Sequence, residues 1–368
     1  MHITIDRGAL LKPLAALNRI VERRPTIPIL GNVLLQARGG HLRLQATDLD
    51  IWAEASAPAV VDAPGALTVP AATFHDIVRK LPDGCQIELT AEGGGARLLV
   101  KAGRSRFVLL SLPEEDWPGL PDEDLPHRFA LPARAVQRIL THTTFAISSE
   151  ETRYYLNGVH LHATEGCLHA AATDGHRLAH ITVPLPDGAA GMPPVTVPRK
   201  TVGELARLAA DAEGDMDFAV SGSKVRFAAA GITLTSKLID GPFPDYRRVI
   251  PTGNDKIATL DSGVLKAAVD RVTTLCGERG RGVRLDFAPV TLTLSVTNAD
   301  AGEASEEVVA DFEGEPLTIG FQGRYLSEIL GVLASDTVRL ALADAGSPCL
   351  IKSHDGAEAL IVLMPMRV

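Results

Sequence analysis

The sequence predicts an α+β fold of three repeated domains, each with two helices packed on antiparallel sheets. Three segments, 3–21, 128–147 and 257–276, each begin with a short strand that leads into an amphipathic helix. The strand at 67–70, also followed by a helix, has counterparts at 195–198 and 317–320, so the repeat spacing is 128 and then 122 residues. Repetition at a nearly constant spacing indicates repeated structural units. A chain of 368 residues also exceeds what one ordinary core accommodates.

Within each repeat, the order strand, helix and three strands occurs twice. In the first repeat, residues 93–95 are three glycines and the expected hairpin turn, because glycine accepts the positive φ that such turns require. Each repeat also has a corner after a strand, at Thr47-Asp48, Thr173-Asp174 and Thr297-Asn298. Proline, glycine and acidic residues accumulate near 122–126 and 251–255, so we expect domains at residues 1–124, 125–253 and 254–368.

The composition is that of a soluble globular protein, with 46% hydrophobic and 22% charged residues. The amino terminus alternates like a strand and lacks the apolar core of a signal peptide, and no apolar run reaches the roughly 18 residues of a membrane span. Four cysteines lie far apart without a Cys-x-x-Cys pair, so we expect reduced thiols rather than disulfides or a zinc site. We therefore expect a cytoplasmic protein without a membrane partner.

The net charge of −9 is distributed unevenly between the expected elements. The six expected helices hold twelve Lys or Arg and five Asp or Glu, which leaves about −16 for the rest of the chain. A basic helical surface would neutralise DNA phosphates without reading the base sequence. The alternative is that these side chains favour helices and are simply solvated.

The end of repeat one and the strand after Thr297 in repeat three carry opposite charge. The first region holds Arg97, Lys101, Arg104 and Arg106, and the second holds Asp300, Glu303, Glu306 and Glu307. Exposed strand edges of opposite sign favour pairing between subunits and disfavour pairing of like edges. A head-to-tail contact of this kind closes into a ring or continues as a filament.

Five sequence blocks, in order along the whole chain, resemble the beta subunit family of bacterial DNA polymerase III. They are RPTIPILGN at 24–32, RYYLNG at 153–158, TDGHRL at 173–178, FPDYRRV at 243–249 and MPMRV at 364–368. The resemblance implies DNA-clamp domains in a head-to-tail homodimeric ring, which encircles double-stranded DNA independently of its sequence and confers processivity on the polymerase. It also implies a clamp loader, the replicative polymerase alpha subunit and other clamp-motif proteins as partners.

The same resemblance implies specific site residues. The DNA-contact candidates are Arg24, Arg153, Tyr154 and Tyr155; packing in a strand or loop is the alternative role for the tyrosines. Two positions depart from the family pattern: Ala72 stands where a basic DNA contact is expected, and Glu150 where a neutral polar one is expected. Together with the charged strand edges, Leu275 completes the predicted dimer interface, which consists of Arg97, Arg104, Arg106, Leu275, Glu303, Glu306 and Glu307.

A hydrophobic cleft for short partner motifs is the third implied site. Its methionines and aliphatic side chains suit an adaptable apolar groove, and its arginines suit polar or acidic motif residues. Gly280 replaces an aromatic often seen there, and Gln322 and Tyr325 match rim positions loosely. The implied cleft residues are Leu156, Thr173, Gly175, His176, Arg177, Leu178, Pro244, Arg248, Val249, Val362, Met364, Pro365, Met366 and Arg367.

Catalytic and metal chemistry is not expected. Five histidines lie between 160 and 180 without a local Cys or carboxylate at metal-ligand spacing, so we predict no metal and no cofactor. Asp174-Gly175-His176 resembles part of a catalytic triad, but the aspartate occupies the repeated corner, where a turn role suffices. A hydrolase that uses the histidine-rich middle domain and a structural solenoid protein are the alternative functions.

Overall fold

The computed structural model describes residues 1–368 except 23, 122, 278–281, 334 and 354–358. The position Gly280 therefore lies outside the described residues. The chain forms two compact units, one of residues 1–133 with 207–237 and one of residues 134–206 with 238–368. Helices α3 (Ala133–Thr143) and α4 (Arg199–Asp211) lie at the divisions between the units.

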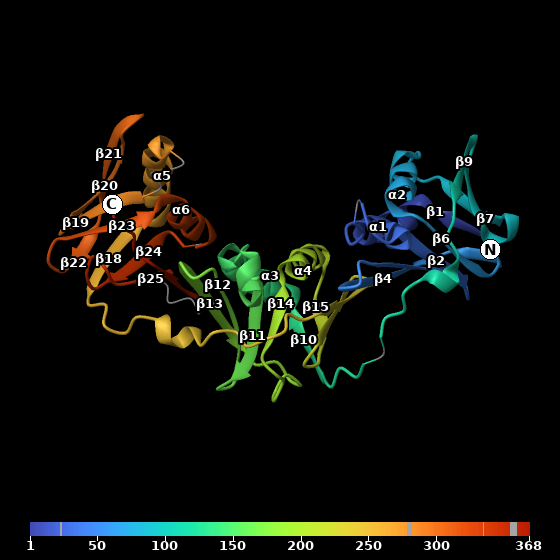
Figure 1. Ribbon diagram of the computed structural model, residues 1–368, viewed down its shortest axis with the longest axis horizontal. Coiled ribbons are helices and arrows are strands. Elements are labelled where there is room, and N and C mark those ends of the chain that lie inside the picture. Colours follow the sequence, from blue (N-terminus) through green and yellow to red (C-terminus); the bar gives the residue numbers. More distant parts are fainter. Residues whose placement is uncertain (23, 122, 278–281, 334, 354–358) are drawn as a thin grey trace. The chain divides into compact units, whose positions relative to one another are not determined.

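The first unit contains two antiparallel sheets and two helices (Figure 1). One sheet has the strand order β5-β1-β7-β8-β9, and the other has the order β10-β15-β16-β17-β4-β3-β2-β6. The elements are β1 (His2–Asp6), α1 (Arg7–Asn18), η1 (Pro28–Gly31), β2 (Asn32–Arg38), β3 (His41–Thr47), β4 (Ile51–Pro58), β5 (Val60–Ala63), β6 (Gly65–Pro70), α2 (Ala71–Lys80), β7 (Gln86–Glu92), η2 (Gly93–Gly95), β8 (Arg97–Ala102), β9 (Ser105–Leu110), η3 (Glu114–Asp116), β10 (His127–Pro132), β15 (Asp215–Val220), β16 (Lys224–Ala229) and β17 (Ile232–Lys237).

Helix α1 begins where the side chain of Asp6 accepts hydrogen bonds from the backbone N–H groups of Gly8 and Ala9. Such caps satisfy N–H groups that have no partner inside the helix. Leu10, Leu14 and Leu17 follow at helical spacing, and all three are fully buried. Burial of one such leucine stabilises the fold by about 2 kcal/mol, so this face fixes the helix on the strands beneath it.

The second unit also contains two antiparallel sheets. Their orders are β14-β11-β12-β13-β26-β25-β24-β18-β22 and β21-β20-β19-β23. The elements are η4 (Thr144–Ala146), η5 (Glu151–Leu156), β11 (Gly158–Thr164), β12 (Cys167–Thr173), β13 (Arg177–Pro184), β14 (Val195–Pro198), η6 (Tyr246–Val249), β18 (Lys256–Asp261), α5 (Ser262–Val272), η7 (Thr273–Leu275), β19 (Gly282–Ala288), β20 (Thr291–Asn298), β21 (Gly302–Val309), β22 (Asp311–Glu313), β23 (Leu317–Gln322), α6 (Gly323–Val332), β24 (Thr337–Leu342), β25 (Cys349–Ser353) and β26 (Ala359–Leu363).

Local predictions from the sequence agree with these elements. All six expected helices form, and residues 93–95 turn between β7 and β8 with three positive φ angles. At the repeated corners, the Asp48 and Asp174 carboxylates accept hydrogen bonds from backbone N–H groups two and three residues later. Asn298 accepts one such bond from the N–H of Asp300. The turn role predicted for Asp174 is thus confirmed.

The strand pairings cross the domain boundaries expected from the sequence. β4 pairs with β17, so strands from the first and middle repeats form one sheet. β13 pairs with β26 in the same way, joining the middle and last repeats. No described helix is long and apolar enough to cross a membrane.

Candidate functional site

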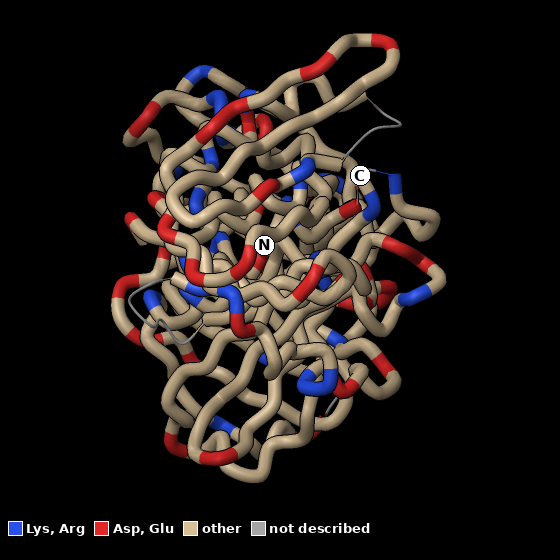
Figure 2. Tube along the Cα trace, turned by 90° about the vertical axis from the view of Figure 1, so that its left-hand side faces the viewer, with Lys and Arg blue, Asp and Glu red and all other residues tan. Residues whose placement is uncertain are grey.

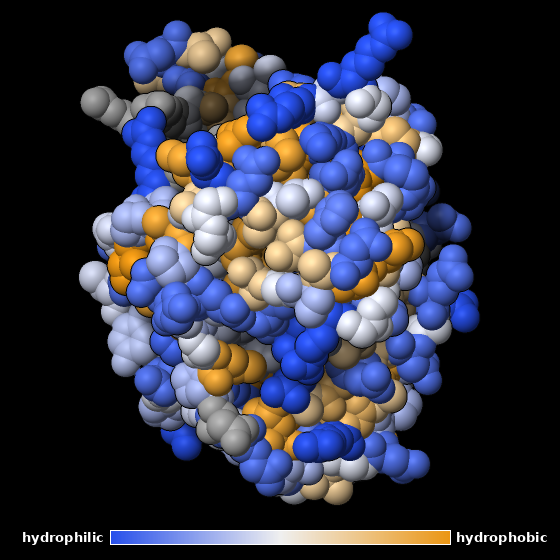
Figure 3. Space-filling view, turned by 90° about the vertical axis from the view of Figure 1, so that its right-hand side faces the viewer, coloured by the Kyte–Doolittle hydropathy of each residue, from blue (hydrophilic) through white to orange (hydrophobic). Residues whose placement is uncertain are grey.

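Each of the two oppositely charged regions includes the outermost strand of a sheet. Arg106 lies on β9 and Arg104 in the turn before it, whereas Arg97 and Lys101 lie on the neighbouring strand β8. Glu303, Glu306 and Glu307 lie on β21. β9 has a partner only in β8, and β21 has a partner only in β20, among the described residues. Leu110 on β9 is 75% exposed and Val309 on β21 is 83% exposed. Figure 2 shows acidic residues along the β20–β21 hairpin at the top of the view. Figure 3, which faces the side that carries β9, shows apolar side chains grouped among hydrophilic ones.

The charged residues of these edges differ in how they are already paired. Arg97, Arg104 and Arg106 are exposed. On β21, Glu306 forms an ion pair with Arg271 of α5 in the same chain. The hydrogen bond and the positive charge of Arg271 lower the pKa of Glu306. Leu275 ends the short helix η7 that follows α5.

The carboxyl-terminal tail is held against the two sheets of the second unit. The N–H of Met364 donates to the carbonyl of His176 (2.9 Å), and the N–H of Met366 donates to the carbonyl of Gly320 (2.8 Å). A Cβ at Gly320 would lie 2.5 Å from the Met366 carbonyl oxygen, and one at Gly282 would lie 2.6 Å from a Val368 methyl. The tail therefore requires glycine at Gly320, where the overlap is with backbone, whereas at Gly282 the overlap is with the end of a side chain.

Replacing Gly320 by Ala is expected to displace the tail and weaken binding of partner motifs at least tenfold. The added methyl would overlap a backbone oxygen, which cannot rotate away as the end of a side chain can. Fluorescence anisotropy of a labelled clamp-motif peptide measures the affinity. Gly331→Ala in α6 is the matched control, because its Cβ would meet only Lys266 Cε at 3.6 Å. Unchanged peptide affinity in Gly320→Ala would show that the seated tail does not form the binding surface.

The corner from Thr173 to Leu178 presents its residues to the tail. Thr173 Oγ1 donates to the carbonyl of Arg177 (2.7 Å) and accepts from the N–H of Gly175. Gly175 has φ of +87°, and a Cβ there would lie 2.4 Å from Arg153 Nη1. β13 then pairs with β26, which places Leu178 opposite Val362. The structure thus brings the predicted residues of 173–178 and 362–366 together.

Arg177 is the most constrained residue of this region. Its side chain is only 7% exposed and forms ion pairs with Asp174 (3.1 Å) and Glu328 (2.6 Å). The guanidinium also lies 4.1 Å from the centre of the Tyr325 ring and 5.2 Å from that of Phe145. Burial alone would raise the pKa of Glu328, but its hydrogen bonds from Arg177 and Arg324 lower it. The sequence predicts that Arg177 holds motif residues, whereas in the structure its guanidinium is engaged by Asp174, Glu328 and Tyr325 of the same chain.

The remaining predicted cleft residues divide into buried and exposed groups. Leu178 and Val362 pack with Ala171 and Tyr246 in one buried cluster, and Leu156 is also buried. Pro244, Val249 and Arg248 are exposed, as are Met364, Met366, His176 and Arg367, whereas Pro365 is half-buried. Arg248 pairs with Asp245 (2.9 Å). The region therefore offers exposed sulfur and aliphatic groups above a rigid apolar floor.

A pocket lies beside this region in the same unit. The rim positions Gln322 and Tyr325 line it together with Glu328, Asp270 and Cys276. Sequence reasoning missed Phe145, Glu328 and Tyr246, which fix the position of the predicted residues. The spacing of the motifs contains no signal for these three, because each reaches the site through the tertiary fold.

The predicted DNA-contact residues are placed as follows. Arg24 is exposed and belongs to the first unit; Arg153, Tyr154 and Tyr155 belong to the second. Tyr154 is 55% exposed, and its ring lies edge-on to Tyr155 with 5.9 Å between centroids. Arg153 is bound by both carboxylate oxygens of Glu150, at 2.9 and 2.7 Å. Glu150, already noted as a departure from the family pattern, therefore neutralises one of the predicted contacts.

The basic residues of the helices are oriented toward solvent. Of the twelve Lys and Arg counted in the expected helices, all except Lys266 are exposed. Arg79, Arg271 and Arg324 each form an ion pair with a carboxylate. The exposed positions agree with either a solvated or a phosphate-binding role.

The middle-domain histidines form an internal cluster. His169 Nδ1 lies 3.1 Å from His180 Nε2, and His162 Nε2 lies 2.9 Å from the Tyr246 hydroxyl. Burial, together with the charge of neighbouring imidazoles, lowers the pKa of His160, His162 and His180 to about 4. Within the described ranges, no three His, Cys, Asp or Glu side chains are placed to hold a metal ion.

Comparison with known proteins covers the whole chain. Models of the DNA polymerase III beta subunit match at 1–121 (N-terminal domain), 130–245 (central domain) and 247–367 (C-terminal domain). The beta sliding clamps of Caulobacter vibrioides and Escherichia coli are 48% and 40% identical, with 100% of each chain covered.

Solved structures agree with these sequence matches. A Bartonella birtlesii sliding clamp bound to griselimycin has a TM-score of 0.97 and 45% identity, with full coverage of both chains. A Pseudomonas aeruginosa beta subunit has a TM-score of 0.94 and 40% identity, again with full coverage. The resemblance inferred from five sequence blocks is confirmed, and the chain belongs to the DNA polymerase III beta subunit family of DNA sliding clamps.

Proposed function

We propose that this chain is a non-catalytic processivity factor, which forms a homodimeric ring around duplex DNA and tethers the replicative polymerase. The observation that carries this proposal is the match to beta sliding clamps along the entire chain. A closed ring does not need tight contacts with DNA, because topology keeps it in place while it slides. Retention on circular DNA tests the proposal, and its two outcomes are given at the end of the Discussion.

The DNA-facing surface would consist of the exposed basic residues on the helices. Contacts of this kind attract phosphates without reading bases, and they weaken as salt increases. Arg24, Tyr154 and Tyr155 would add contacts, since two are exposed and Tyr155 is half-buried beside Tyr154. Arg153 would contribute less charge while Glu150 binds it.

The dimer would form between β9 of one subunit and β21 of another. Both strands end their sheets and carry unpaired edges, which is the arrangement that strand addition requires. Arg97, Arg104 and Arg106 would meet Glu303, Glu306 and Glu307, while Leu275 and the exposed aliphatic residues would add apolar contact. The head-to-tail geometry of two subunits would close the ring.

Reversing the charges of Arg104 and Arg106 to Glu is expected to shift the protein from dimer to monomer at micromolar concentration. The reversed edge would face carboxylates, and close like-charge contacts cost several kcal/mol across an interface. Light scattering gives the mass directly. Arg339→Glu with Lys352→Glu, cross-strand neighbours on β24 and β25, is the matched double reversal away from both edges. A dimer mass retained by the Arg104/Arg106 variant would refute the edge assignment.

We further propose that the cleft around Leu178, Val362 and Met364 binds motifs from the clamp loader, the polymerase alpha subunit and other clamp-motif proteins. The buried floor and exposed methionines suit short apolar motifs of varied sequence. We also propose three domains at 1–124, 125–253 and 254–368. Both junctions lie in connecting segments, after η3 and after η6.

A further inference from the structure

The outer face of the eight-stranded sheet carries a row of cross-strand neighbours that the proposed function does not use. Trp52 on β4 is opposite Thr235 on β17, and Thr235 is opposite Arg226 on β16. Arg226 is in turn opposite Ala219, which is opposite Arg128 on β10. Directly opposed residues point to the same face of an antiparallel sheet, so this row is continuous across five strands.

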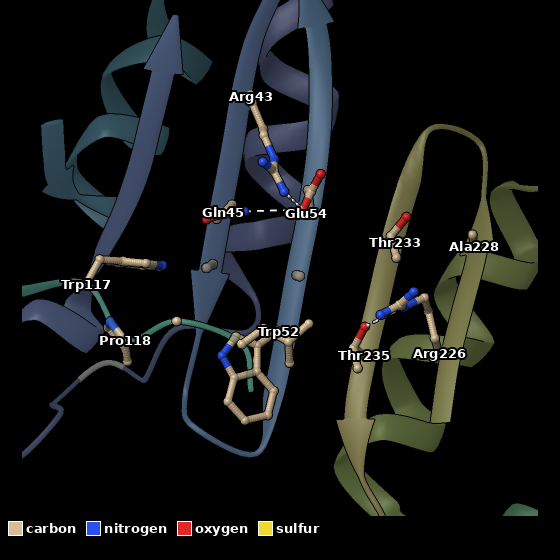
Figure 4. Close-up of a pocket in the computed structure, with 14 residues that line it drawn as sticks. Arg43, Gln45, Trp52, Glu54, Trp117, Pro118, Arg226, Ala228, Thr233 and Thr235 are labelled. Atoms are coloured by element: carbon tan, nitrogen blue, oxygen red, sulfur yellow. Dashed lines mark hydrogen bonds and ion pairs between the residues drawn. The ribbon is translucent and has the colours of Figure 1, made fainter. Parts of the chain in front are cut away.

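A pocket of about 450 Å³ lies over this row (Figure 4). Strands β3, β4, β16 and β17 form its base, and the connecting segment 117–120 lies beside it. Trp52 and Trp117 both line it, together with Arg226 and the Arg43–Glu54 ion pair. Figure 4 shows these side chains reaching in from three directions: two hairpins and the connecting segment.

The pocket continues in both directions along the sheet. A second pocket over β10 and β15 shares Arg226 and Ala228 with it, and a third over β2 and β3 shares Arg43 and Glu54. These three adjoining pockets are called the outer groove below. Its lining residues come from strands β10 to β2 of the sheet, and a surface that crosses this many strands fits an extended chain.

Two polar side chains in the central pocket are incompletely paired: one lacks a hydrogen-bond acceptor, and the other lacks a carboxylate. Trp52 Nε1 is buried and donates no hydrogen bond. Arg226 donates from Nε to Thr235 Oγ1 (3.2 Å), and no carboxylate among the described residues pairs with it. A guanidinium without a carboxylate partner forms strong hydrogen bonds with an anionic group, so an occupant that neutralises Arg226 would be favoured.

The charges of the outer groove distinguish between classes of occupant. Arg128, Arg226 and Arg38 line it without a carboxylate partner among the described residues, but Asp217, Glu54 and Glu114 line it too. Nucleic acid would place phosphates beside those three carboxylates. A peptide supplies a carboxylate and an apolar side chain at discrete points along the groove.

We propose that the outer groove binds an extended peptide segment of a partner protein. A carboxylate of the peptide pairs with Arg226, and an apolar or aromatic side chain packs against Trp52 and Trp117. This surface lies in the first unit and shares no residue with the proposed motif cleft in the second. Its occupancy is therefore independent of motif binding.

The two tryptophans provide a selective test, because they are the only ones in the chain and both line the central pocket. The probes are acetyl-Gly-Asp-Phe-Gly-amide and its neutral match, acetyl-Gly-Asn-Phe-Gly-amide, titrated into the intact protein. A probe bound in the motif cleft leaves tryptophan emission unchanged, since no tryptophan lies there. We expect a saturable emission change with the Asp peptide and at least fivefold weaker binding of the Asn peptide.

Arg226→Gln is expected to weaken the Asp peptide at least fivefold while leaving the Asn peptide unaffected. Arg339→Gln, on β24 of the other unit, is the matched control, and equal thermal midpoints show that both variants fold. The proposal is overturned if neither peptide gives a saturable change, or if Arg226→Gln binds the Asp peptide as well as the unaltered protein does. Stronger displacement by a thymidine decanucleotide, or by 3-phenylpropionate, would assign the groove to nucleic acid or to a small acid and would likewise overturn it.

Discussion

Replacing Arg177 by Met is expected to lower the free energy of unfolding by about 3 kcal/mol and to reduce motif binding at least tenfold. Loss of one partner from a buried ion pair leaves an uncompensated charge, which costs about 3–5 kcal/mol. We expect the lower end of this range because Asp174 still accepts hydrogen bonds from two backbone N–H groups, and Glu328 still accepts one from Arg324. The stacking of the guanidinium on Tyr325 is lost as well.

Arg324→Met provides the control for this substitution. Arg324 also pairs with Glu328, but its side chain is 81% exposed, so its removal should cost under about 1 kcal/mol. Urea unfolding and peptide anisotropy measure the two effects on the same samples. Equal stability of the two variants would mean that the buried network around Arg177 does not hold the corner from Thr173 to Leu178 in place.

The histidine cluster is expected to make the protein lose stability as the pH falls from about 6.5 to 4. His160, His162 and His180 have pKa values lowered to about 4 in the fold, against 6.5 when unfolded. In this interval the unfolded chain binds protons that the folded chain does not, so acid favours unfolding. Above pH 6.5 both states hold neutral imidazoles, and the full contribution is present.

Lowering the pKa of one histidine from 6.5 to about 4 corresponds to a contribution of roughly 3 kcal/mol to the free energy of unfolding. The three rings are neighbours and two of them are half-buried. After allowance for solvent screening, we expect the free energy of unfolding to fall by about 5 kcal/mol in total between pH 6.5 and 4. His169 and Arg247 add positive charge beside the cluster and act in the same direction.

Thermal midpoints between pH 7.5 and 4.5 measure this dependence. The triple variant His160→Leu, His162→Phe and His180→Val should show a flatter profile, because the groups that take up protons on unfolding are gone. His41→Gln, an exposed position on β3, is the control and should keep the full slope. A triple variant that loses stability as steeply as the unaltered protein would place the acid sensitivity elsewhere.

The repeated elements could be predicted from the sequence because each depends on short-range signals. Helix periodicity, the Asp and Asn corners and the glycine turn at 93–95 all act within a few residues. The two edge regions could also be predicted, because clusters of opposite charge mark them in the sequence itself. Their outermost position agrees with the assignment made from Arg104 and Glu303.

The shared sheets could not be predicted in this way. β4 and β17 lie about 180 residues apart, and β13 and β26 are separated just as widely, so no local pattern identifies their pairing. The same limit applies to Arg177, whose partner Glu328 is 151 residues away. The family motifs identified Arg153 as a DNA contact, but only the side-chain geometry shows that Glu150 binds it.

The central claim is that two copies of this chain close into a ring around duplex DNA. Its most direct test is loading of the labelled protein onto nicked circular DNA by the clamp loader and ATP, followed by gel filtration before and after a single cut. The account predicts that the protein stays with the circles through moderate salt and leaves once the DNA is linear. Retention that linearisation does not change would contradict the ring, because binding would then depend on contacts rather than on topology.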